Sequence, residues 1–157
     1  MAELDGTVRE SNVRDSIKKF FYDNLTTTEG IAVSFDRTLS TPKIQGVEVD
    51  KWYTIMPGEI RLGTLSEMDV NVFCCTKKDP EGFRLAQLRD KVMGYLIDTT
   101  MTDGMKRITL YRSSATEAWT SLGKMCVQIE AESDQLEAED KTKFKVITIM
   151  LRWGARC

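Results

Sequence analysis

The sequence contains no histidine among its 157 residues. This absence removes the most common base at neutral pH, the Ser-His-Asp and Cys-His catalytic pairs, and a frequent ligand of transition metals. A GxxxxGK[ST] phosphate loop and a GxGxxG turn after a strand are also missing. The four cysteines have no CxxC spacing and predict no zinc site. We therefore expect no catalytic residues, no cofactor, no metal and no enzymatic activity.

Long apolar runs and an excess of one charge are missing as well. No stretch approaches the ~18 consecutive apolar residues of a membrane span. The N-terminal segment, MAELDGTVRESNVRD, lacks the basic-then-apolar order of a secretory signal. Twenty-two Lys and Arg balance 24 Asp and Glu, and the basic residues are scattered, which does not favour a nucleic-acid-binding face. We expect one domain, residues 1–157, made in the cytoplasm and without membrane contact.

Two segments have the apolar spacing of amphipathic helices. The first is predicted from Val8 to Leu25, and Thr7 with Glu10 has the spacing of a capping box. The second is predicted from Asp79 to Ile97, because Asp-Pro-Glu is typical of a helix start.

Six segments have the alternation or the β-branched and aromatic content of strands. They are residues 31–36, 47–56, 68–75, 106–112, 124–131 and 143–153. Pro57-Gly58 predicts a break, after which Glu59–Leu65 could continue the second strand past a bend. The order α-β-β-β-α-β-β-β indicates an α+β fold, with two amphipathic helices packed together on one face of a mainly antiparallel sheet.

The closing segment, KFKVITIMLRW from Lys143 to Trp153, is the strongest strand pattern. Phe144, Val146, Thr148 and Met150 lie on one side, and Lys145, Ile147, Ile149 and Leu151 on the other. Since both sides are mostly apolar, we expect helices to cover one of them and another sheet or subunit to cover the other.

Several residues have two interpretations. Glu67 and Asp69 share a strand face and form either an acid/base pair or, as we favour, a solvated edge. The cysteines are expected to be reduced, with at least one in the core, although Cys157 could link subunits. Trp119, in a polar loop, either packs against that loop or anchors a partner.

The acidic connection between the last two strands also has two interpretations. Its carboxylates could hold a cation, but it lacks the glycine and the alternating pattern of a calcium loop. We favour a charged hairpin tip. The acidic residues are Glu130, Glu132, Asp134, Glu137, Glu139 and Asp140.

The order of elements resembles the tail terminator (tail completion) proteins of long-tailed bacteriophages. An amphipathic helix, VRDSIKKFFYDNL, leads into the short strand IAVSF. A strand, MDVNVFCCTKKDPEGF, runs directly into the helix RLAQLRDKVMGYLID. The turn and strand KRITLYR and a hairpin from MCVQIEAES to KFKVITIMLRW follow. The resemblance covers Val8 to Trp153 and rests on element order, not on an invariant motif.

The resemblance implies a structural virion protein at the head-tail junction. Such proteins form a ring, usually a hexamer, that caps the head-proximal end of the tail tube, ends tube polymerisation and docks the tail to the head connector or stopper. DNA passes through the lumen without specific binding. We expect the acidic connection, Glu132–Asp140, or the Arg37–Gly46 loop to contribute to the lumen or to tube contacts. The expected partner-interface or lumen residues are Trp119, Glu132, Asp134, Glu137, Glu139, Asp140 and Trp153.

Three alternatives remain at this point. The chain could be another neck protein, such as a head-tail adaptor or stopper. It could also be a small-molecule enzyme of unknown class, or a non-phage binding module with a cystatin-like helix-on-sheet form.

Overall fold

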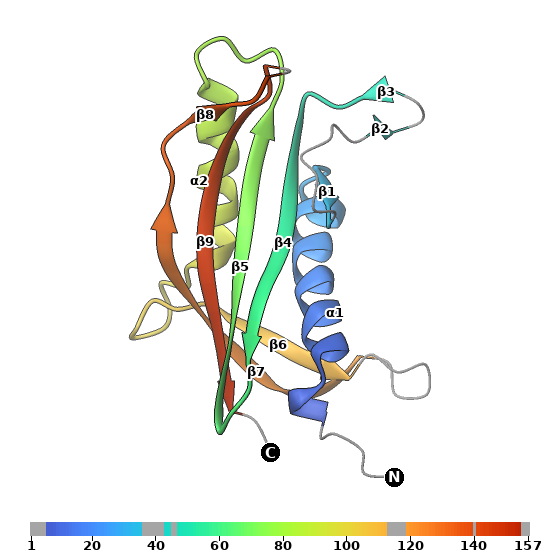
Figure 1. The fold of residues 1–157 in the computed structure, drawn as a ribbon, viewed down its shortest axis with the longest axis vertical. Helices are drawn as coiled ribbons and strands as arrows, with labels where there is room; N and C mark the ends of the chain where they lie inside the picture. Colours follow the sequence, from blue (N-terminus) through green and yellow to red (C-terminus); the bar gives the residue numbers. More distant parts are fainter. Residues whose placement is uncertain (1–5, 36–42, 45–46, 113–118, 140, 155–157) are drawn as a thin grey trace.

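The computed structural model describes residues 6–35, 43–44, 47–112, 119–139 and 141–154 (Figure 1). The first helix, α1 (Glu10–Phe21), follows a short 3-10 turn, η1 (Gly6–Val8), and continues as a π-helix, η2 (Tyr22–Thr28). The second helix is α2 (Phe83–Leu96). Neither helix, nor any other helical segment in the part described, is long and apolar enough to span a membrane.

The main sheet has the strand order β1-β4-β5-β9-β7-β6, with β8 also paired to β9. Among the pairings described, only that of β1 with β4 is parallel. A separate small hairpin joins β2 to β3. The strands are β1 (Ala32–Ser34), β2 (Lys43–Ile44), β3 (Val47–Glu48), β4 (Lys51–Arg61), β5 (Leu65–Thr76), β6 (Arg107–Arg112), β7 (Thr120–Glu132), β8 (Leu136–Glu137) and β9 (Lys143–Gly154). The sequence-based prediction of two helices with a mainly antiparallel sheet is confirmed.

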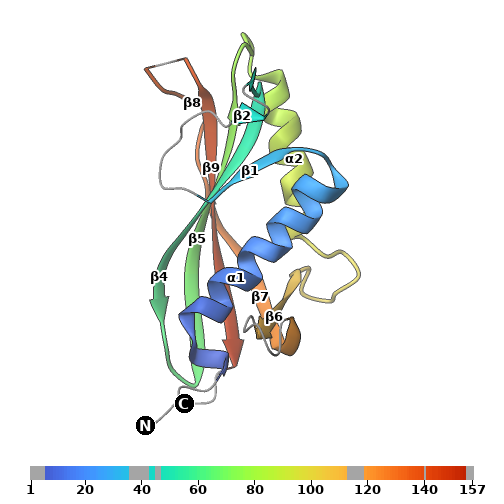
Figure 2. The ribbon, with the colours of Figure 1, turned by 90° about the vertical axis from the view of Figure 1, so that its right-hand side faces the viewer.

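The two faces of the sheet differ in burial. In the central strands, alternate side chains point to the helices and are buried there, and both helices contribute to this single core. Figure 2 shows the curled sheet with α1 crossing in front of its strands and α2 beside its upper part. The central-strand residues of the core are Met68, Val70, Val72 and Cys74 of β5 and Ile147, Ile149, Leu151 and Trp153 of β9. One side of the closing strand is thus covered by helices, as predicted.

Both helix starts differ from the prediction. The Thr7–Glu10 capping box is wrong, because α1 begins only at Glu10 and its N-cap residue makes no side-chain cap hydrogen bond. The α2 helix begins at Phe83 instead of Asp79, after Gly82 at φ +71°. The carboxylate of Asp79 nevertheless accepts hydrogen bonds from the backbone N–H groups of Arg84 (3.4 Å) and Leu85 (3.0 Å). It therefore satisfies the open donors of the first turn from outside the helix.

The predicted break at Pro57-Gly58 is a bulge inside one long strand. The register of β4 against β5 shifts between Pro57 and Ile60. Pro57 is tolerated because β1 pairs only with residues 52–54, so the missing N–H falls on a sheet edge. A Cβ at Gly58 would lie 3.1 Å from the carbonyl oxygen of Asp69, which favours glycine there.

Two buried cysteines lie next to each other on opposite faces of β5. Cys74 points to the core and is a free thiol, and Cys75 points to the other face. Burial raises the pKa of the Cys74 thiol above its usual range. This confirms that at least one cysteine is a core residue. Cys126 is free and half-buried, whereas Cys157 lies outside the described residues.

Trp153 is a core residue and not a surface anchor. Its side chain is 2% exposed, and its indole N–H donates a hydrogen bond of 2.7 Å to the carbonyl oxygen of Thr7. This bond ties the last strand to the turn before α1. The expectation that Trp153 contacts a partner or the lumen is therefore corrected, because its side chain is buried within its own chain.

We expect Trp153→Phe to lower the free energy of unfolding by about 1–2 kcal/mol, through the lost hydrogen bond and the smaller ring. Urea unfolding followed by circular dichroism measures the change. The matched control is Trp119→Phe at an exposed site, for which a change within about 0.5 kcal/mol is expected. Equal stability of the two variants would contradict the anchoring role of Trp153.

Candidate functional site

The central strands leave a half-buried apolar surface on the side away from the helices. We define the outer sheet face as the side chains of Asn71 and Phe73 on β5 and of Val146, Thr148 and Met150 on β9. All five are half-buried, and the two strands place them side by side in register. Single exposed apolar residues are common on proteins, but a contiguous group over two neighbouring strands is typical of an interaction surface.

A polar pair lies within this apolar surface. The Thr148 hydroxyl donates a hydrogen bond of 2.9 Å to the side-chain oxygen of Asn71. Because this bond already pairs the hydroxyl of Thr148 with the amide oxygen of Asn71, a partner that covered the outer sheet face would leave fewer polar atoms without a hydrogen bond. On one side of the pair, Phe73 lies 6.3 Å from Phe144 between ring centroids.

A cluster of charged residues forms one end of the outer sheet face. Arg61 bridges Glu67 (3.3 Å) and Asp69 (3.2 Å), and Arg152 approaches Glu67 at 3.3 Å. Hydrogen bonding to Asp69, and then to Glu67, raises the pKa of the Arg61 guanidinium. Both carboxylates are therefore held by guanidinium groups, an arrangement that orders this sheet edge and does not suit an acid/base pair.

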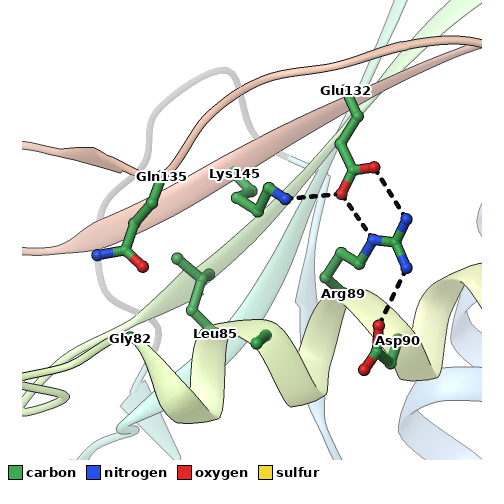
Figure 3. A pocket seen from close by; sticks show the side chains of 8 residues that line it. Gly82, Leu85, Arg89, Asp90, Glu132, Gln135 and Lys145 are labelled. Carbon is green, nitrogen blue, oxygen red and sulfur yellow. Dashed lines mark hydrogen bonds and ion pairs between the residues drawn. The ribbon is translucent and has the colours of Figure 1, made fainter.

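Glu132 lies in an ion-pair network between β7, β9 and α2 (Figure 3). Its carboxylate accepts two hydrogen bonds from Arg89, at 2.6 and 3.0 Å, and one of 2.8 Å from the ammonium group of Lys145. A third guanidinium bond of 3.0 Å joins Arg89 to Asp90. The bonds from Arg89, followed by those from Lys145, lower the pKa of Glu132 from its ordinary value of 4.5 to about 2. Glu132 thus fastens the helix to the sheet and is not a free carboxylate facing a lumen.

This network borders a pocket of about 310 Å³ at the start of α2. Gln135 reaches over Gly82 on its rim (Figure 3). With Arg89, Lys145 and Glu132 mutually satisfied, we assign the pocket no ligand.

The other acidic residues of the predicted site are separate from this network. Asp134, Glu137 and Glu139 are exposed near β8, and Asp140 lies outside the described residues, as do residues 37–42 and 45–46 of the Arg37–Gly46 loop. Within the described ranges, no three His, Cys, Asp or Glu side chains are placed to hold a metal ion. Among the described carboxylates of the predicted site, the structure therefore places Glu132 in the ion-pair network and Asp134, Glu137 and Glu139 outside it.

Trp119 forms an exposed aromatic surface with residues of the first helical segment. Its ring packs edge-on against Tyr111 at 5.9 Å between centroids, and the Lys19 ammonium lies 5.1 Å from the ring centroid. The Trp119 side chain nevertheless remains 46% exposed, and Tyr22 remains 52% exposed. The two line a pocket of about 420 Å³ together with Phe35. Trp119 thus packs on its own chain and also stays accessible to a partner.

Sequence reasoning missed several residues of these surfaces. Tyr22 and Phe35 follow elements with clear apolar patterns, and the pattern gives no sign that they stay accessible. The roles of Arg61 and Arg89 depend on strand register and helix docking, which bring distant carboxylates next to them. The spacing of Glu67 and Asp69 was the one local signal of the Arg61 cluster, since two carboxylates on one strand face attract a cationic side chain.

Comparisons with known proteins show the fold and not the family. No protein-family model matches the sequence, and no curated protein matches it. Eleven solved protein chains match the structure. One of them, a protein that carries no functional name, superimposes with a TM-score of 0.58 over 92% of this chain and 95% of its own length, at 8% sequence identity. At this identity, the likeness shows a shared fold alone.

We expect Glu132→Gln to reduce stability by about 1 kcal/mol at about pH 7, a value that allows for solvent screening of a side chain that is 23% exposed. Because the folded pKa is depressed, this stabilisation is present above pH 4.5 and is lost as the pH falls to about 2. Urea unfolding across this range measures the difference between the variant and the wild type.

The matched control is Glu130→Gln, a neighbouring exposed carboxylate on β7. It should leave stability within about 0.5 kcal/mol of the wild type at each pH. A Glu132→Gln difference that stays constant down to about pH 2 would contradict the assigned role of the carboxylate charge.

Proposed function

We propose that this chain is a structural virion protein, the tail terminator of a long-tailed bacteriophage. Its copies form a ring, a hexamer in this proposal, that caps the head-proximal end of the tail tube and docks it to the head connector or stopper. We take its core architecture to be α-β-β-β-α-β-β-β, to which the two-residue strands β2, β3 and β8 are additions, with both helices on one face of the sheet. The core shared by both helices supports it.

The observation that carries the proposal is the outer sheet face. Phe73, Val146 and Met150 are apolar, half-buried and adjacent on the two central strands. A second copy that covered them would bury apolar surface against a rigid sheet, which stabilises association. We infer that the outer sheet face of one copy meets a different surface of the next copy, and that such head-to-tail contacts close by rotation into a ring.

The function needs no covalent chemistry from the protein. One side of the ring imitates a further layer of tube, and the other side lacks a tube-like surface, so polymerisation stops. DNA passes through the lumen during ejection. The proposal therefore assigns roles in shape and contact, and no catalytic residue.

Trp119 and Tyr22 are suited to contacts with a neighbouring protein. Both are large, exposed aromatic side chains beside lysines that already lie over aromatic rings. Aromatic anchors of this kind often dominate the binding energy of an interface. We propose that they contact either the tube protein or the connector.

We expect the wild-type protein to associate in sedimentation equilibrium, at high concentration or beside tube protein, and Met150→Lys to weaken this association at least about tenfold. The reason is that association would bury an added charge without a partner. Met101→Lys is the matched control, since Met101 is an exposed methionine in the turn after α2. It should associate like the wild type.

Loss of association in both variants, or in neither, would contradict the role of the outer sheet face. A wild-type chain that is monomeric at every concentration, alone and beside tube protein, would contradict the ring itself.

Electron microscopy of particles that lack the protein separates the terminator from other neck proteins. Absence of a terminator leaves overlong tubes or unattached tails. Absence of an adaptor or stopper leaves normal tails beside leaking heads, an outcome that would replace the proposed function.

A further inference from the structure

A pocket rich in lysine lies at the end of the molecule opposite to β6. It has a volume of about 800 Å³ and is lined by residues of the loop that joins β5 to α2 and of the segment from β8 to β9. Figure 1 shows these two segments at the same end of the molecule. We call it the lysine pocket. Its lining residues are Lys77, Lys78, Asp79, Pro80, Glu137, Lys141 and Lys143.

The ammonium groups of the lysine pocket differ in their partners from the guanidinium groups of Arg61, Arg89 and Arg107. Elsewhere, Arg61, Arg89 and Arg107 each lie within 3.5 Å of a carboxylate oxygen. In the lysine pocket, no ion pair joins Lys78, Lys141 or Lys143 to any carboxylate within the described ranges. Lys78, Lys141 and Lys143 therefore share one concave surface without an ion pair to a described carboxylate, which favours a local positive potential on a protein of net charge −2.

Among the residues described, two carboxylates line the lysine pocket, and they differ in how far they are already bonded. Asp79 is 7% exposed, and its oxygens already accept hydrogen bonds from the Thr76 hydroxyl and from the first turn of α2. Glu137 is exposed and faces Lys143 across the short β8–β9 pairing. Lys143 is itself held in place, because its ammonium group donates a 2.6 Å hydrogen bond to the carbonyl oxygen of Pro80. This bond fixes one ammonium group of the pocket in place.

We propose that the lysine pocket binds an anion that carries two or more phosphate groups. Lysine contacts phosphate oxygens as a compact point charge, and several ammonium groups can share neighbouring phosphates. Among the residues described, no aromatic side chain lines the pocket, so none is available to stack on a nucleic-acid base. No arginine lines it either, so none is available to bind a carboxylate through two parallel hydrogen bonds. The ligand is thus recognised by its phosphate charge and spacing.

Two kinds of molecule present neighbouring phosphate groups in this way: a free polyphosphate and the backbone of DNA. The inference does not rest on the proposed ring, since the pocket is lined by one copy of the chain. The probes are inorganic tripolyphosphate, followed by calorimetry, and a short fluorescent DNA duplex, followed by anisotropy, both at low salt. We expect at least one of them to bind, with an affinity that falls as salt rises. The probe that binds identifies the source.

The test variant combines Lys78→Gln with Lys141→Gln. We expect about tenfold weaker binding, from the loss of two exposed charge contacts. The matched control combines Lys106→Gln with Lys124→Gln at the β6 end, which changes the net charge equally and should bind like the wild type. Glu137→Gln should act in the opposite sense and strengthen binding about two- to threefold, because it removes the exposed carboxylate of the pocket.

Several outcomes would overturn the proposal, after circular dichroism has shown that each variant is folded. They are the absence of binding to both probes, equal loss of binding in the control and test variants, and binding of poly-glutamate as tight as that of tripolyphosphate. The last result would make the pocket a site for carboxylates instead of phosphates.

Discussion

The antiparallel pairing of β9 with β5 is the constraint on which the rest of the structure depends. All twelve residues of β9 have partners in β5, and β7 and β8 pair along its other edge. Since successive side chains alternate between faces, this register places Ile147, Ile149 and Leu151 in the core beneath the helices. The same register places Val146, Thr148 and Met150 on the opposite face. A slip by one residue would exchange the two sets and lose the core.

The function that we propose depends on this division. The helices and Trp153 complete the core on one side, whereas the other side keeps apolar residues half-exposed on a rigid sheet. The network of Glu132 with Arg89 and Lys145 joins α2 to the sheet by ion pairs. A rigid surface loses little conformational freedom on association, which favours assembly from many copies. Trp119 and the lysine pocket share no residue with the outer sheet face.

The sequence predicted the elements better than their partners. Alternation in Lys143–Trp153 and apolar spacing in the two helices are local signals, so the strand and the helices were found. Which strands flank β9 depends on contacts between distant residues, and no local pattern encodes them. The capping box failed because Gly6–Val8 forms a 3-10 turn in which the Thr7 carbonyl accepts the Trp153 bond. Residues of the same type also differ in their surroundings, which a local pattern does not encode. Glu132 is paired with Arg89, whereas Glu137 is exposed near β8. Trp153 is buried, whereas Trp119 is exposed.

The most direct measurement is electron microscopy of the purified protein, alone and mixed with tail-tube protein. Our account predicts closed rings in which the outer sheet face of each copy is covered by its neighbour, so that Val146 and Met150 lie at the contact between copies. Rings that leave this face open to solvent would contradict the role given to β9. Isolated single copies at every concentration and in every mixture would contradict the account as a whole.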